Sequence, residues 1–168
     1  MEEVMTGLLD QKIAREAADL IRPVILGMME REKVERKTLA LVVLSPHARY
    51  GTFINVEDAI LHEEIIGQPR QTWETGRTYD AYARGKAAIT WRTGMTSREV
   101  IESHPHLLIQ GDAKYAGSAI YRGIITAASG VEDHYDEMFA GMYAVTCHGL
   151  VMTKMKAIKA DPAIAFIG

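Results

Sequence analysis

The segment KTLALVVLS, residues 37–45, restricts the fold of this chain more than any other stretch. It is a continuous apolar run, rich in branched side chains. Such a run is typical of a strand that is buried on both faces, because a strand with one wet face alternates apolar and polar residues. The sequence therefore predicts a central strand in a sheet that carries structure on both sides.

The order of the other expected elements favours an antiparallel sheet. These elements are a helix over 8–34, one or two extended segments within 52–67, helices over 78–93 and 97–104, a hairpin over 117–129, and a long helix from 131 onward. Strands come in adjacent pairs without helices between them. We therefore expect an α/β protein of the α+β type, with three layers (α-β-α) and a central antiparallel sheet of about five strands that has helices on both faces.

Local signals predict where these elements begin and end. Thr6 or Asp10 is expected to cap the first helix. Gly94 is expected to end the helix over 78–93, and Thr96 to Glu99 (TSRE) has the pattern of a capping box. The hairpin is expected to turn tightly at Arg122–Gly123, two residues that join apolar strands.

Length and charge limit the class of protein. With 168 residues, we expect one domain over 1–168, with a loose tail at 160–168. The formal net charge of −3 argues against a nucleic-acid partner. The acidic N-terminus is unlike a secretory signal, and no apolar run reaches the ~20 residues that cross a bilayer, so we expect a cytoplasmic protein without a membrane partner. The single cysteine, Cys147, is interpreted as a small buried hydrophobic residue.

LHEEIIG, residues 61–67, places a histidine and two carboxylates in an otherwise apolar run. Side chains alternate along a strand, so His62 and Glu64 are expected on one face and Glu63 on the other. Carboxylates and imidazoles act as general acids and bases when burial and neighbours tune their pKa values. We therefore expect Glu64 and His62 to line a pocket, with Glu63 facing it if the strand is bulged. The alternative interpretation is a half-exposed edge strand with solvated acids.

Three cations are candidates for binding an acidic ligand: Arg92, Arg122 and Lys86. An arginine grips a carboxylate through two parallel hydrogen bonds, which a lysine cannot do. The alternatives are a surface charge for Arg122 and a cation that packs against the sheet for Lys86.

Four aromatic residues are candidates for the walls around a flat ring: Trp73, Trp91, Tyr115 and Tyr121. Tyr115 lies in the glycine-flanked loop GDAKYAG, and side chains on such loops often serve function. Core or rim positions are the alternative for each ring.

No motif indicates a metal or a nucleotide. In HPH, residues 104–106, Pro105 keeps the backbone extended between the two histidines, and no acidic ligand is close in sequence. The phosphate-binding glycine loops and the serine-hydrolase elbow are absent from the sequence. We expect no metal and no organic cofactor.

Two stretches of the chain, ARGKAAITWRTG (83–94) and AIYRGIITAASGVEDHYDEMFA (119–140), carry a resemblance. The matching features are Lys86–Ala87, Arg122–Gly123, Ser129–Gly130 and Asp136. In these features the sequence resembles the GlcG/HbpS group of haem-degrading-domain-like proteins, over roughly residues 8–150. The resemblance implies an antiparallel sheet between helices and a homo-oligomer, as a dimer or a larger ring. It also implies an alternative function, a non-catalytic module that binds haem or a corrinoid.

The first strands and the segment GDAKYAG differ from the common members of that group. There the chain is similar to a divergent branch, the 4-hydroxylaminobenzoate lyases, in RPVI, ALVV, HEEIIG and TWRTGM. This resemblance implies a lyase that converts a hydroxylamino-substituted aromatic acid to protocatechuate and ammonia. The expected roles are acid/base catalysis by Glu64 and His62, polarisation by Tyr115, and binding of the substrate carboxylate by Arg92 or Arg122.

Overall fold

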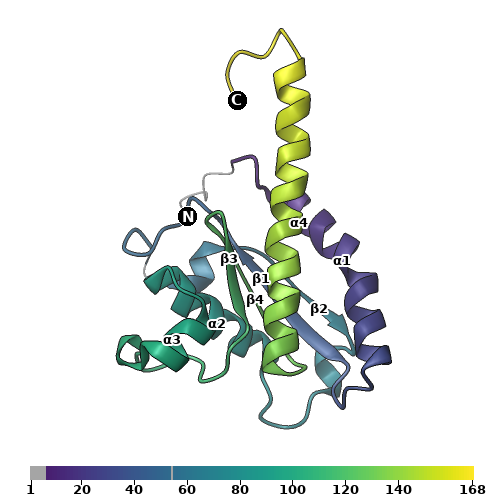
Figure 1. Cartoon of the computed structure of the whole chain (residues 1–168), viewed down its shortest axis with the longest axis vertical. Coiled ribbons are helices and arrows are strands. Elements are labelled where there is room, and N and C mark those ends of the chain that lie inside the picture. Colours follow the sequence, from purple (N-terminus) through teal and green to yellow (C-terminus); the bar gives the residue numbers. More distant parts are fainter. Residues whose placement is uncertain (1–6, 54) are drawn as a thin grey trace.

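The computed structural model describes residues 7–53 and 55–168, and it has three layers with a sheet between helices (Figure 1). The strands are β1 (Thr38–Leu44), β2 (Ile60–Gly67), β3 (Ser118–Tyr121) and β4 (Ile124–Ser129). They pair antiparallel in the order β2-β1-β4-β3. The helices are α1 (Gln11–Arg31), α2 (Tyr79–Thr93), α3 (Ser97–Ser103) and α4 (Asp133–Ala160). The antiparallel α/β fold predicted from the sequence is confirmed.

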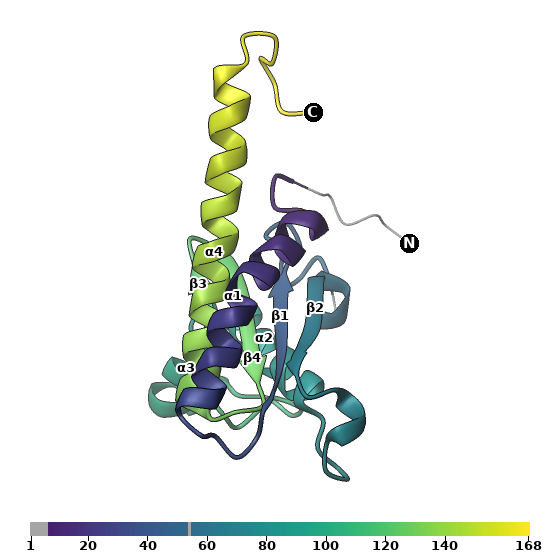
Figure 2. The same cartoon turned by 90° about the vertical axis from the view of Figure 1, so that its right-hand side faces the viewer.

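Strand β1 is buried along its whole length and divides the core in two. Its odd-numbered residues, Leu39, Leu41 and Val43, pack with α1 and α4 in one cluster. Its even-numbered residues, Ala40, Val42 and Leu44, pack with α2 in the other. Figure 2 shows α1 and α4 together over one face of the sheet. Both faces of β1 are therefore apolar because each faces a helical layer, as the unbroken apolar run predicts.

The described part of the chain has four strands in the sheet, so the expectation of about five is wrong. A further extended segment was expected before β2, within residues 52–59. Residues Val56–Ala59 instead wind into a short 3₁₀ turn, which the backbone of Asn55 begins. Only β2 remains extended in this segment, and it forms one edge of the sheet.

The ends of the elements follow the local signals. Asp10 caps α1 by accepting a hydrogen bond from the Ile13 N–H at 2.8 Å, whereas Thr6 lies outside the described residues. Thr96 caps α3 by accepting from the Glu99 N–H at 3.2 Å. Arg122 and Gly123 both have positive φ, 48° and 81°, as a tight hairpin turn requires.

Helix α4 extends well beyond the sheet that it covers (Figures 1 and 2). It has 28 residues without a break at Gly149, and its buried side chains end at Cys147. Past that point Leu150 and Val151 still pack against the core and Lys154 donates to Asp10 at 3.3 Å, but Met152 is 55% exposed. No helix in the described ranges is both long and apolar enough to cross a membrane.

Candidate functional site

Lys86 is a charged residue in the core, at 1% exposure. It lies in α2 between Ala83 and Ala87, whose small side chains let the helix approach the sheet. Its ammonium group donates to the carbonyl oxygen of Ala128 on β4 and to a carboxylate oxygen of Asp136 on α4, each at 3.0 Å. A buried cation is tolerated only with partners of this kind.

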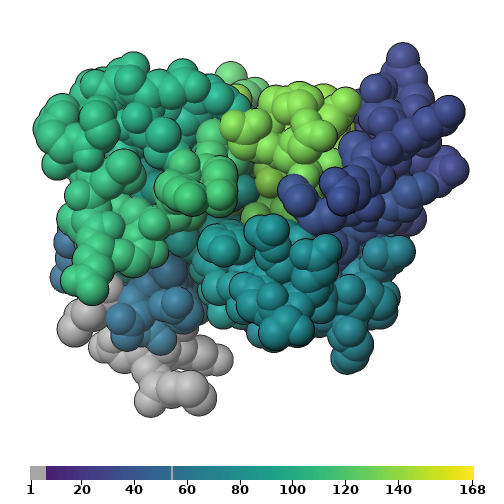
Figure 3. Space-filling view, turned by 90° about the horizontal axis from the view of Figure 1, so that it is seen from below, coloured from purple at the N-terminus to yellow at the C-terminus, as the bar shows by residue number. Residues whose placement is uncertain are grey.

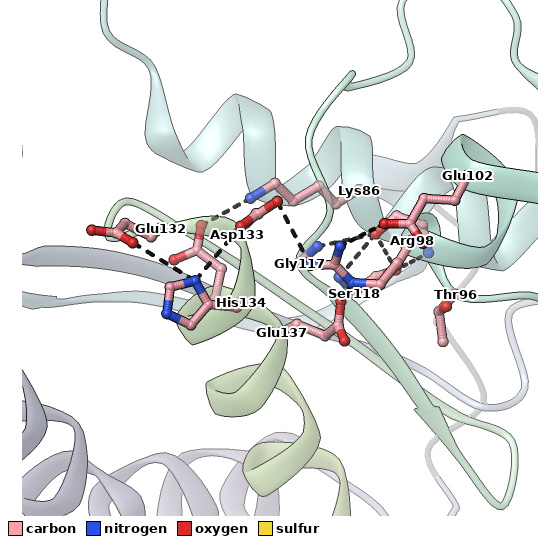
Figure 4. A network of polar contacts seen from close by, with 12 residues as sticks. Lys86, Thr96, Arg98, Glu102, Gly117, Ser118, Glu132, Asp133, His134 and Glu137 are labelled. Carbon is pink, nitrogen blue, oxygen red and sulfur yellow. Dashed lines mark hydrogen bonds and ion pairs between the residues drawn. The ribbon is translucent and has the colours of Figure 1, made fainter. Parts of the chain in front are cut away.

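Gly117 makes the space that the ammonium group occupies. Its φ is +151°, and a Cβ there would lie 2.6 Å from the Ala128 oxygen and 2.7 Å from the Lys86 nitrogen. Its N–H donates to the hydroxyl of Ser97 at 3.1 Å, as does the N–H of Ser118. These bonds hold the start of β3 beside Lys86 (Figure 4).

Asp136 lies in the first turns of α4 and is 3% exposed. Besides Lys86, its carboxylate accepts hydrogen bonds from the backbone N–H of Val131 at 3.1 Å and of Gly130 at 3.4 Å. The chain enters α4 through Gly130, where φ is +144° and a Cβ would collide with the backbone of Thr38. This entry aims the start of α4 at the sheet and brings Asp136 to Lys86.

Burial disturbs the proton equilibria of this pair in opposite directions. Burial lowers the pKa of Lys86 below its ordinary value, although the charge of Asp136 opposes this. Burial also raises the pKa of Asp136, against the effect of Lys86 and of the two backbone N–H groups. Both shifts favour the neutral forms, so the pair can exchange a proton more easily than the same groups in water. Such pairs are frequent at active sites.

Asp136 lines a cavity of about 490 Å³ at the end of the sheet where α4 begins, here called the α4 hollow. Its other lining residues are Arg36, Arg77, Tyr79, Tyr82, Tyr115, Ser129, Gly130, Glu132 and Asp133. Figure 3 views this end of the molecule, where the start of α4 (lime), the loop before β3 (green) and the segment before α2 (teal) meet.

Three tyrosines form much of the wall of the α4 hollow. The rings of Tyr82 and Tyr115 meet edge to face, with centroids 6.4 Å apart, and Tyr115 is 48% exposed. Tyr79 is buried, and the guanidinium of Arg36 lies 5.8 Å from its ring centroid. Aromatic faces and edges attract one another, so walls of this kind favour a flat aromatic ring as a ligand.

The two arginines of the α4 hollow differ in how they are held. Arg36 donates to the carbonyl oxygens of Gly130 at 2.8 Å and Val131 at 2.5 Å, so its position is fixed. Arg77 has only a loose ion pair with Glu74, at 3.8 Å, among the described residues. Arg77 therefore retains donors for a ligand anion.

His62 and Glu64 lie on the other side of the sheet from α2. The His62 Nε2 and a Glu64 oxygen are 2.9 Å apart, and Arg22 of α1 binds the second Glu64 oxygen. Burial raises the pKa of Glu64, but hydrogen bonds from His62 and Arg22 outweigh it, and the net shift is downward. Glu64 is thus held as an ion-paired carboxylate, between α1 and β2.

Glu63 points to the opposite face, as the alternation along the strand predicts. Both of its oxygens accept from Arg84 of α2, at 2.9 and 2.6 Å. A cavity of about 210 Å³ beside it is also lined by Glu64 and Asp80 but by no aromatic residue. The aromatic walls expected around the acidic pair are therefore not found there.

Arg92, Trp91 and Arg122 lie together at the far end of α2 and of the sheet. They line a cavity of about 550 Å³, here called the arginine hollow, with Leu44, Ser45, Pro46, Ala48, Arg49, Tyr50, Gly123 and Ile125. Tyr121 lies elsewhere, with its ring 5.3 Å from that of His148 on α4. Trp73 donates to the hydroxyl of Thr38 at 2.9 Å.

The structure distributes the predicted site residues over several places and does not bring them into one cavity. Glu64 and His62 face α1, Glu63 pairs with α2, Tyr115 lines the α4 hollow, and Arg92 lines the arginine hollow. The reason is geometric: α2 has 15 residues and is ~22 Å long, and the two hollows lie at its opposite ends.

Tyr79, Tyr82, Arg36 and Arg77 were not predicted as site residues. A signal for part of this set exists in the sequence, because Tyr79, Tyr82 and Lys86 follow the helical spacing of three and four and share a face of α2. In the described residues, no three His, Cys, Asp or Glu side chains converge as metal ligands would. Burial raises the pKa of Cys147 to about 12, which keeps it a thiol.

Comparisons with known proteins bear on the fold alone. No family model matches the sequence, and no curated protein matches it. The crystal structure of the Ybr137w protein superposes with a TM-score of 0.53 and 12% sequence identity, over 84% of this chain and 79% of that one. At this identity, the likeness shows that this chain is similar to Ybr137w protein in fold.

Proposed function

We propose that this protein is a lyase that converts a hydroxylamino-substituted aromatic acid, of the 4-hydroxylaminobenzoate type, to protocatechuate and ammonia without an organic cofactor. The substrate class comes from the resemblance carried by residues 62–67 and 90–95. We assign the chemistry to the α4 hollow. One observation carries this assignment: Asp136, an acid whose pKa burial raises, lines a tyrosine-walled cavity and is hydrogen-bonded to the buried Lys86.

The α4 hollow suits a small benzoic acid in size and in lining. Its volume of about 490 Å³ lies within the usual range of ligand pockets. Tyr82 and Tyr115 offer an edge and a face to an aromatic ring. Arg77 supplies the cation for the ring carboxylate, because its only ion pair among the described residues is the loose one with Glu74.

The reaction needs proton transfer at each step and takes up one water overall. Protonation of the hydroxyl oxygen lets the N–O bond break, with water leaving. A second water then adds to the neighbouring ring carbon and gives its proton to a base. A third water hydrolyses the resulting imine, ammonia leaves, and loss of the ring proton restores the catechol. A group that alternates between acid and base serves all of these steps.

Asp136 and Lys86 have the properties that such a group requires. Asp136 reaches the cavity, and its raised pKa lets it hold and release a proton. Lys86 is buried and donates a hydrogen bond to Asp136, so the two side chains can share a proton. The phenol of Tyr115 is half-exposed at the same wall and donates to the substrate. Acid/base roles for Glu64 and His62 stay a prediction, to be tested against this one.

The test is turnover of 4-hydroxylaminobenzoate, with protocatechuate and ammonia both quantified. We expect the two products in equal amounts, and a fall in kcat of about a hundredfold or more in Asp136→Asn. Circular dichroism checks that this variant is folded. No turnover by the wild-type protein at high enzyme concentration would refute the function.

Two further variants distinguish the α4 hollow from the pair of His62 and Glu64 as the place of the chemistry. Arg77→Ala is expected to raise KM with little change in kcat, whereas the exposed Arg15→Ala on α1 serves as the matched control. Glu64→Gln is the discriminating variant. If it abolishes turnover while Asp136→Asn stays active, the chemistry belongs to the pair of His62 and Glu64 and the assignment to the α4 hollow is wrong.

We also propose that the protein acts in the cytoplasm as a homo-oligomer. The support is α4, whose C-terminal part extends beyond the sheet and which leaves Val145 and Met152 about half exposed. Exposed apolar surface of this kind is typical of association surfaces. Light scattering coupled to gel filtration measures the mass, and Met152→Glu is expected to lower it. A wild-type mass equal to the single chain at micromolar concentration refutes the oligomer.

A further inference from the structure

The arginine hollow carries positive charge that the described residues do not neutralise. Of its three arginines, Arg92 is paired, because Asp112 accepts two of its hydrogen bonds at 3.1 and 2.5 Å. Arg49 and Arg122 have no carboxylate within ion-pair distance in the described ranges. Two uncompensated guanidinium groups at one cavity favour an anion as its occupant.

Aromatic and apolar side chains form the rest of the wall. The indole of Trp91 is fixed by a 2.7 Å hydrogen bond from its N–H to the carbonyl oxygen of Ala48. The ring of Tyr50 meets it edge to face, with centroids 5.4 Å apart. Leu44 and Ile125 supply apolar surface beside them. A small inorganic anion would leave this surface bare, whereas a planar organic anion covers it.

Arg122 occupies a backbone position that suits arginine poorly. Its φ of +48° lies in the left-handed region, which favours Asn or Gly at this place in a hairpin turn. Its guanidinium lies 5.6 Å from the ring centroid of Tyr121, outside the lining of the cavity, and Arg122 itself is part of that lining. The strain at Arg122 is consistent with a side chain kept for binding, because strained residues gather at ligand sites.

The described lining of the arginine hollow contains no carboxylate and no imidazole. Asp112 is engaged by Arg92 and by the N–H of Ile109 at 2.8 Å. Ser45 accepts from the N–H of His47 at 3.4 Å. The remaining polar groups are the phenol of Tyr50 and the arginines, and the arginines keep their charge at every accessible pH. The charged groups of this cavity therefore suit the binding of an anion.

We infer that the arginine hollow is a second binding site, for a small planar carboxylate of the arenecarboxylic acid class, distinct from the α4 hollow. Arg49 and Arg122 bind the carboxylate, and Trp91 and Tyr50 flank the ring. With about 550 Å³, the cavity admits a single-ring acid. The inference rests on this cavity alone and does not require the lyase activity.

The two tryptophans of the chain allow each end to be observed separately. Trp91 lines the arginine hollow, whereas Trp73 lies near the other end, with its ring 5.0 Å from that of Tyr79. In Trp73→Phe, indole fluorescence therefore reports on the arginine hollow alone. Benzoate, cyclohexanecarboxylate and inorganic phosphate are titrated into this variant as the three probes.

We expect benzoate to change the Trp91 fluorescence saturably and the other two probes to bind at least about tenfold more weakly. Adding Arg49→Ala or Arg122→Ala is expected to raise the Kd for benzoate about tenfold or more, because each removes a hydrogen bond to a charged group. Adding Arg77→Ala, at the α4 hollow, is the matched control and should leave this Kd unchanged.

Each other outcome overturns the inference. An absent or unsaturable response means that no site exists, and a Kd insensitive to Arg49 and Arg122 means that the site lies elsewhere. Phosphate binding as tight as that of benzoate refutes the aromatic ligand class. Failure of the proposed lyase function is read from product formation, so the two failures are distinguishable.

Discussion

The two hollows lie at opposite ends of α2, and both combine aromatic walls with cations, yet their charges are organised differently. Next to the α4 hollow the cation is Lys86, which is buried and donates a hydrogen bond to the carboxylate of Asp136. In the arginine hollow the cations are exposed or engaged arginines that cannot lose a proton. An ammonium group that is buried beside a carboxylate has a shifted pKa, which suits it to proton transfer. An exposed guanidinium keeps its charge, which suits it to binding an anion.

The largest effect should come from breaking the buried pair. Lys86→Met leaves Asp136 without its cation in the core, and it should lower the free energy of unfolding by about 3–5 kcal/mol. Urea denaturation monitored by circular dichroism measures this. The double variant Lys86→Met/Asp136→Asn should recover part of the loss, since it removes both charges and keeps an oxygen that accepts from the Val131 N–H. A loss below about 1 kcal/mol in the single variant would mean that the pair is not desolvated.

The corresponding change at the other end should cost less. Arg92→Met removes the partner of Asp112, which keeps its hydrogen bond from the Ile109 N–H. We expect the free energy of unfolding to fall by about 1–3 kcal/mol in the same urea experiment. If this loss exceeds that of Lys86→Met, the contrast between the fully buried pair of Lys86 and Asp136 and the partly buried pair of Arg92 and Asp112 is wrong.

A third change should separate stability from binding. Arg122→Asn replaces arginine at φ +48° with a residue that tolerates this conformation. With Gly123 it gives the turn the sequence Asn-Gly, which is common in tight hairpins. The free energy of unfolding should rise by about 0.5–1 kcal/mol. Benzoate affinity, measured from Trp91, should fall at the same time. A variant that is both less stable and equally able to bind would remove the argument that Arg122 is kept for a ligand.

The smallest effect concerns Glu64, which lies outside both hollows. Its folded-state pKa is below the ordinary value of 4.5, so it stabilises the protein above that pH and loses this contribution as the pH falls through the folded-state pKa. At neutral pH, Glu64→Gln should cost about 0.5 kcal/mol. The difference between wild type and variant should shrink below the ordinary pKa. Thermal unfolding at neutral and acidic pH measures it, and a constant difference would contradict the ion pair.

Local patterns in the sequence predicted the elements and the layers. The apolar run of β1, the cap at Thr96 and the turn at Arg122 depend on neighbours in sequence, and each is where the pattern places it. For residues 52–67 the pattern left one or two extended segments open, and the 3₁₀ turn at Val56–Ala59 leaves β2 as the extended one.

The candidate site could not be assembled in the same way. Lys86 and Asp136 are 50 residues apart, and Arg22 and Glu64 are 42 apart. No periodicity connects such pairs, because their contact depends on the order of strands in the sheet. The helical spacing of Tyr79, Tyr82 and Lys86 is visible in the sequence. That Tyr115, in the loop before β3, lines the same cavity as Tyr79 and Tyr82 could not be predicted from the sequence.

The alternation of β1 between two cores has a consequence for how the molecule tolerates changes in length. Removing a single residue such as Ala40 would exchange the side chains that the two helical layers meet, so neither core would fit its helices. Insertions in 45–53 or 108–117 leave that strand untouched. These loops carry Arg49, Tyr50 and Tyr115, so ligand preference at either end can diverge while the strand between them keeps its length.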